Sequence, residues 1–118
     1  MTPEHKLQSE ILVALSSHGC TPFRINVGSG RTVDGRYFNT GAPKGYPDIS
    51  GFIWSNGKAF FIEVKTPTGR PRKDQIRFHE MLARHQIIHG IARSVSDAFT
   101  IVDKELVGYG FKDYGGSK

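Results

Sequence analysis

The chain is poor in features that anchor a protein, secrete it or cross-link it. It has one cysteine, Cys20, which excludes a disulfide framework and a cysteine-based zinc site. No stretch approaches the roughly 18 apolar residues of a membrane-spanning helix, and the first residues lack the apolar run of a signal peptide. The histidines are scattered without the spacing of metal ligands. We therefore expect an intracellular, cytoplasmic protein that is not secreted and has no membrane partner.

Negative charge is in deficit. Lys and Arg number 16 against 11 Asp and Glu, a net charge of +5, which favours a polyanionic partner. Many of the positively charged residues lie within one short span, at Lys65, Arg70, Arg72, Lys73, Arg77 and Arg84. A solvated surface also collects charge, so composition leaves both interpretations open.

Hydrophobic periodicity predicts one α/β domain, over residues 1–107, followed by a loosely ordered Gly-rich tail, 108–118. Thr2 and Pro3 mark the start of a first helix. Helices are expected at 2–17, 73–85 and 96–106, the last capped by Ser96-Asp97. Strands are expected at 22–27, 36–39, 49–54, 58–65 and 87–94. This order indicates one mixed sheet with helices packed on it.

The pair Asn56-Gly57 between two apolar runs predicts a β-hairpin. Counting outward from this turn places Ser50 opposite Glu63 and Asp48 opposite Lys65. Because side chains alternate between faces, Asp48, Glu63 and Lys65 then share one face. Diagonal neighbours lie about 7–8 Å apart, so one divalent cation can bridge the two carboxylates.

The other face of the second hairpin strand carries Phe60, Ile62 and Val64, which indicates a central strand. Acids there are costly unless they are paired or bind a metal. A structural ion pair with Lys65 is the competing explanation, and it accounts for one acid better than for two. Two carboxylates beside a lysine suit metal-assisted phosphodiester hydrolysis, because Mg²⁺ prefers oxygen ligands and activates its bound water.

The spacing Pro47-Asp48 and Glu63-Val64-Lys65 resembles the signature of the PD-(D/E)xK nuclease superfamily. Further matching segments are Glu4-x-x-Leu7-Gln8, Arg24-Ile25-Asn26, Gly45-x-x-Asp48-Ile49, Gln75 and Val95-Ser96-Asp97. Together, from about Glu4 to Val102, they resemble the virus-type replication-repair nuclease (VRR-NUC) domain in its small stand-alone phage form. The resemblance implies a restriction-endonuclease-like core, in which elements in α-β-β-β-α-β order flank a central mixed sheet.

The resemblance also implies roles for individual residues. Asp48, Glu63 and the backbone carbonyl of Val64 would hold the metal, and Lys65 would be catalytic. A first-helix glutamate completes the acidic set, and either Glu4 or Glu10 can supply it.

The helix wheel favours Glu4, because Glu4 lies on the stripe of Leu7, Ile11 and Leu15 whereas Glu10 lies at its flank. An acid in the first turn is also favoured by the helix dipole alone. We therefore expect Glu4 at the metal and Glu10 beside the ligands.

Two glutamines match family positions next to the site. Gln8 and Gln75 are polar residues on otherwise apolar helical faces. Gln75 is expected to take part in catalysis and Gln8 to lie beside the ligands. A partly buried amide that bonds only the backbone is the competing interpretation for both.

The implied function is a Mg²⁺-dependent, structure-specific endonuclease for branched DNA, including Holliday junctions, active as a homodimer in phage DNA repair. Mn²⁺ would substitute for Mg²⁺, and no small-molecule substrate is expected. Arg24 and Asn26 contact phosphate or lie on a solvated strand edge. The candidate DNA-binding residues are Arg24, Asn26, Lys44, Arg70, Arg72, Lys73 and Arg77. The alternatives are a non-catalytic nucleic-acid-binding module on a nuclease fold and a sequence-specific restriction-type enzyme.

Overall fold

The computed structural model describes residues 2–25, 29–39, 41–112 and 114. In chain order its elements are α1 (Pro3–Ser16), β1 (Cys20–Arg24), β2 (Ser29–Arg31), β3 (Tyr37–Asn39), β4 (Ile49–Ile53), β5 (Ala59–Val64), α2 (Lys73–Arg84), β6 (Ile88–Ala92), α3 (Val95–Asp103) and β7 (Val107–Tyr109). None of the described helices is long and apolar enough to cross a membrane.

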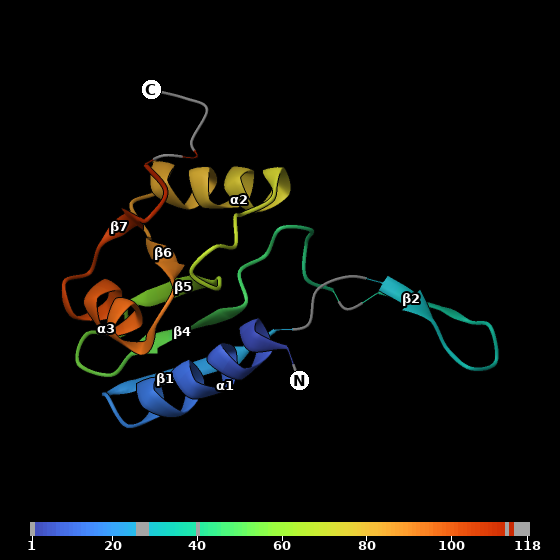
Figure 1. Ribbon diagram of the computed structural model, residues 1–118, viewed down its shortest axis with the longest axis horizontal. Coiled ribbons are helices and arrows are strands. Elements are labelled where there is room, and N and C mark those ends of the chain that lie inside the picture. The colour runs from blue at the N-terminus through green and yellow to red at the C-terminus, as the bar shows by residue number, and fades with distance from the viewer. Residues whose placement is uncertain (1, 26–28, 40, 113, 115–118) are drawn as a thin grey trace.

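A five-stranded mixed sheet in the order β1-β4-β5-β6-β7 forms the middle layer. The helices α1 and α3 cover one face and α2 covers the other (Figure 1). The strand β4 is antiparallel to both β1 and β5, whereas β6 is parallel to both β5 and β7. The predicted α/β fold with helices flanking a mixed sheet is confirmed.

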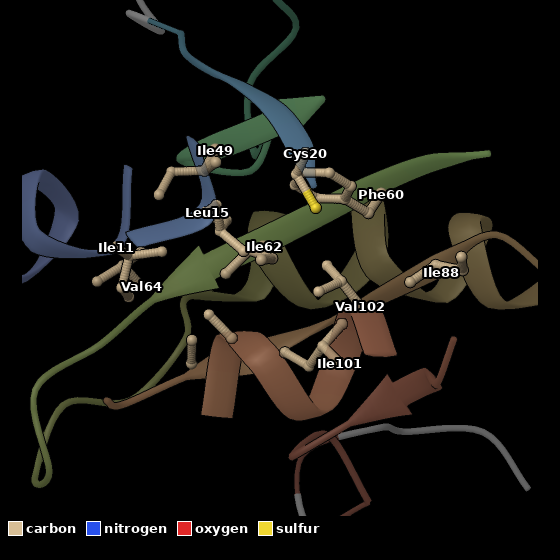
Figure 2. Packing of buried hydrophobic residues seen from close by; sticks show 12 residues of the cluster. Ile11, Leu15, Cys20, Ile49, Phe60, Ile62, Val64, Ile88, Ile101 and Val102 are labelled. Atoms are coloured by element: carbon tan, nitrogen blue, oxygen red, sulfur yellow. The ribbon is translucent and has the colours of Figure 1, made fainter. Parts of the chain in front are cut away.

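The first helix forms where its end signals predict it. The Thr2 side chain accepts a hydrogen bond from the His5 N–H at 3.1 Å, and Pro3 stands at the first helical position. Ile11 and Leu15 are fully buried among the core residues of β5 (Figure 2). Burying one such side chain contributes about 1.5–3 kcal/mol, which fixes α1 against the sheet.

The hairpin of β4 and β5 has a register different from the predicted one. Ser50 lies opposite Phe61, not opposite Glu63. The centre of the turn lies one residue earlier in the chain than predicted, which shifts the pairing of the two strands by two residues. The Ile53 N–H donates to the Lys58 carbonyl at 2.9 Å in this register. The Asn56 side chain accepts from the Lys58 N–H at 2.9 Å, which holds this tighter turn. A shift of two residues leaves every side chain on its predicted face, and it moves Asp48 from opposite Lys65 to opposite Glu63.

Two short strands were not predicted. The strand β2 pairs with β3, and together they form an arm that projects from the body (Figure 1). The strand β7 pairs with β6, and Phe111 just after it is buried. The expectation of a loose tail from Gly108 is therefore wrong for β7 and Phe111.

Two element boundaries also differ from the prediction. The strand β1 begins at Cys20 rather than Pro22, and the predicted strand residues Asn26 and Val27 lie outside the described residues. The helix α3 is capped by Ser94 rather than Ser96, because the Ser94 hydroxyl accepts from the Asp97 N–H at 3.0 Å.

Candidate active site

Three oxygen donors meet at the open end of the β4–β5 hairpin. The Val64 N–H donates to Asp48 Oδ2 at 2.8 Å, whereas the next N–H, of Lys65, donates to the Ala92 carbonyl on β6. Successive residues of a strand direct their backbone groups to opposite edges. The Val64 carbonyl therefore points to the same edge of β5 as the Val64 N–H, which is the edge that faces Asp48. The Glu63 carboxylate, which is close enough to Asp48 for its charge to raise the Asp48 pKa, completes this group of oxygens.

The surroundings of the Asp48 and Glu63 carboxyl groups disfavour their ionised forms. Glu63 is fully buried and Asp48 is half-buried. Burial first, and the adjacent Glu63 charge second, raise the pKa of Asp48 to about 7. Burial likewise raises the pKa of Glu63 to about 7. At neutral pH the pair therefore retains a proton, which a divalent cation can replace. Such a donor set fits a hard cation.

Both oxygens of the Glu63 carboxylate contact side chains of α2. Gln75 Nε2 donates to Glu63 Oε2 at 2.8 Å, and His79 Nε2 lies 3.3 Å from Glu63 Oε1. Gln75 is itself oriented, because its Oε1 accepts from the Arg72 N–H at 2.8 Å. Gln75 and His79 lie one helical turn apart on the same face of α2.

Lys65 lies beside this pair with its side chain only 7% exposed. Its Nζ is 4.0 Å from Glu4 Oε1, which lies on the first turn of α1. Glu10 is exposed farther along the same helix. The structure thus brings Glu4, and not Glu10, to the lysine.

A cleft of about 280 Å³ opens in front of these residues. Its lining contains six of the predicted site residues: Glu4, Gln8, Arg24, Asp48, Arg72 and Gln75. Within the described part of the chain, no three His, Cys, Asp or Glu side chains converge into a ready metal cluster. The donor set here is two carboxylates and a carbonyl.

The other predicted DNA contacts lie outside the cleft. Lys44, Lys73 and Arg77 are exposed. The guanidinium of Arg70 lies 5.9 Å from the centre of the Tyr114 ring. Asn26 lies outside the described residues.

Arg24, at the rim of the cleft, has two partners on α1. Its Nη1 lies 3.1 Å from His5 Nε2, and its Nη2 donates to Ser9 Oγ at 2.8 Å. These contacts tie β1 to the helix that carries Glu4.

Sequence reasoning missed two histidines behind Glu63. His79 Nδ1 and His89 Nδ1 are 2.7 Å apart, and both rings are buried. Burial lowers the pKa of each to about 3, so both are neutral at physiological pH. One signal was available in the sequence: His79 follows Gln75 by four residues and so shares its face of α2. The position of His89 beside Phe61, which shares its face with Glu63, depends on the pairing of β6 with β5.

Two residues just before β4 also shape the site. Gly45 belongs to a segment that carried the family resemblance, whereas Tyr46 was given no role in the site. The Tyr46 hydroxyl donates to Ser50 Oγ at 3.2 Å. Gly45 has a φ of +87°, and a Cβ there would lie 2.3 Å from the Asp74 carbonyl oxygen on α2. Only glycine allows this close approach, which places α2 against the cleft.

Comparison with known protein families gives one match. The family model described as the VRR-NUC domain matches residues 4–96, most of the chain. No curated protein matches the chain significantly.

Proposed function

The chain belongs to the VRR-NUC domain family, a group of nucleases of the PD-(D/E)xK type, and we propose on this premise that it is a Mg²⁺-dependent endonuclease that cuts branched DNA. One observation supports the metal dependence above all. Asp48 and Glu63 are adjacent carboxyl groups whose pKa values burial raises to about 7. A protein does not gain stability from such a pair without a cation, so its presence indicates a metal-binding role.

The roles of the site residues follow from their placement. Asp48, Glu63 and the Val64 carbonyl would hold the cation, and Gln75 keeps the Glu63 carboxylate oriented. Bound Mg²⁺ would supply an activated water and offset charge on the phosphate. The Lys65 ammonium, held near Glu4, stabilises the negative charge that develops on the phosphate. Mn²⁺, which accepts the same oxygen ligands, is proposed as a substitute.

The proposed substrate is recognised through its phosphates. Arg24 and Arg72 line the cleft, and Lys73 and Arg77 extend the positive charge along α2. The three described helices pack on the sheet (Figure 1), and the candidate contacts to DNA are charged side chains of the kind that bind phosphate. Recognition of DNA shape rather than sequence is therefore proposed, and the binding should weaken steeply with salt.

The biological setting is part of the same proposal. A four-way junction has two-fold symmetry, so a homodimer suits the symmetric cutting of both strands. We propose that the protein resolves branched DNA during phage DNA repair, in the cytoplasm of the infected cell.

The test is a cleavage assay with a synthetic four-way junction, a flap and a linear duplex, in Mg²⁺ or in EDTA. The wild type should cut the branched substrates in Mg²⁺ only, and Asp48→Asn should cut none. Cutting in EDTA, or undiminished cutting by Asp48→Asn, would contradict the proposal. Junction binding without any turnover would favour a non-catalytic binding module, and fixed cut sites on the linear duplex would favour a restriction-type enzyme.

A further inference from the structure

The contacts of Glu63 extend beyond Gln75 into a row of buried groups that the proposed chemistry does not use. Glu63 Oε1 lies 3.3 Å from His79 Nε2, and His79 Nδ1 lies 2.7 Å from His89 Nδ1. The three side chains are each no more than 1% exposed. Histidines buried in this way next to a carboxylate need a reason, because apolar side chains of similar volume would pack there at lower cost.

The hydrogen-bonding chemistry fixes where the protons lie. An ionised Glu63 only accepts, so His79 must carry its proton on Nε2. The other nitrogen of a neutral His79 is then an acceptor, so His89 must donate from Nδ1. That leaves His89 Nε2 without a proton.

The far end of the row agrees with this assignment. His89 Nε2 is buried and has no hydrogen-bond partner among the described residues. A buried acceptor without a partner is better tolerated than a buried N–H donor without one.

We propose that His79 is a positioning residue that holds the Glu63 carboxylate in its metal-binding orientation, and that His89 fixes the tautomer of His79 that does so. The inference rests on the proposed metal-dependent function. Gln75 and His79 each occupy one oxygen of Glu63. Each carboxylate oxygen accepts two bonds, so one position on each stays open to a cation.

A purely structural role for the histidines is the competing explanation. The Phe111 ring stacks on His79, with ring centres 4.3 Å apart, and it also lies against His89. Phe111→Leu therefore perturbs the packing of the pair without removing a hydrogen bond, and it is the matched control.

The first measurement is Mn²⁺ binding to the full-length chain by calorimetry, without DNA. His79→Leu should weaken Mn²⁺ binding about ten- to a hundredfold, as expected for the loss of a hydrogen bond to a metal ligand. His79→Gln, whose amide can still donate to Glu63, should recover most of this loss. Phe111→Leu should bind Mn²⁺ as the wild type does. An equal loss in Phe111→Leu and His79→Leu would overturn the inference in favour of packing.

Asp48→Asn separates this inference from the proposed function. If Asp48→Asn binds Mn²⁺ as well as the wild type, the proposed metal site itself is wrong. If Asp48→Asn loses binding and His79→Leu retains it, the metal site stands and the role of His79 is wrong.

The second measurement needs no variant and so covers the case in which His79→Leu does not fold. Long-range ¹H–¹⁵N NMR spectra of the metal-free wild type at pH 8.5 report the tautomer of each histidine. His79 should carry its proton on Nε2 and His89 on Nδ1. A His79 protonated on Nδ1 would overturn the inference.

Discussion

Replacing Asp48 by Asn should abolish the proposed activity and yet make the metal-free protein more stable. The amide oxygen can still accept the hydrogen bond that the Val64 N–H donates to Asp48 at 2.8 Å. The charge next to buried Glu63, however, is removed. A site built for a cation holds two carboxylates together at a cost, and removing one of them releases that cost when no cation is bound.

The sign and size of the effect follow from the pKa of Asp48. Burial and the Glu63 charge raise this pKa from 3.8 to about 7. The folded protein therefore keeps a proton that the unfolded chain releases, so stability falls as the pH rises from about 4 to about 7 and then levels off. At about 1.4 kcal/mol per pKa unit the full shift corresponds to roughly 4 kcal/mol. Because the pair shares one proton and Asp48 is only half-buried, we expect about 2 kcal/mol.

The assay is urea denaturation in EDTA at pH 5 and pH 8. At pH 8, Asp48→Asn should be more stable than the wild type by about 2 kcal/mol, and at pH 5, which lies part-way through the pH range of the loss, the difference should be clearly smaller. Saturating Mn²⁺ should stabilise the wild type and leave the variant unchanged. The control is Asp34→Asn on the arm, where hydrogen bonds from the Thr32 hydroxyl and the Arg36 N–H lower the pKa of an exposed carboxylate, so no gain is expected. A variant no more stable than the wild type at pH 8 would refute the reasoning.

Three further results are expected. Lys65→Met should lower the single-turnover cleavage rate at least about a hundredfold with unchanged junction affinity; an unchanged rate would remove Lys65 from the chemistry. Gly45→Ala should lower the free energy of unfolding by at least about 2 kcal/mol in urea titrations, because φ is +87° and the new Cβ meets backbone of α2; an unaltered midpoint would contradict this. Lys73→Ala and Arg77→Ala should each reduce the salt slope of junction binding by about one, whereas Arg84→Ala, at the far end of α2, should not; equal effects would mean that the charge acts without a defined contact.

The sequence predicted the elements whose signals are local. The start of α1 was encoded by Thr2 and Pro3, and the hairpin by Asn56-Gly57. The strands β2 and β7 were missed because each has only three residues and a glycine at its centre, whereas the equally short β3 was predicted at Tyr37-Phe38. Such short strands are defined by the strand they pair with rather than by their own periodicity.

The candidate site shows the same division. Alternation along a strand was sufficient to place Asp48, Glu63 and Lys65 on one face, even though the register was wrong by two residues. The contact between His79 and His89 could not be predicted in this way, because it depends on how α2 lies across β6. Each histidine alone is indistinguishable from an ordinary core residue.

The central claim is that Asp48 and Glu63 hold one divalent cation. Anomalous scattering from crystals soaked in Mn²⁺ tests it most directly, with Asp48→Asn crystals as the control. We predict a single strong peak between the two carboxylates and next to the Val64 carbonyl in the wild type, and no peak in the variant. A wild-type crystal saturated with Mn²⁺ that shows no peak there, or a peak that persists in Asp48→Asn, would contradict the account.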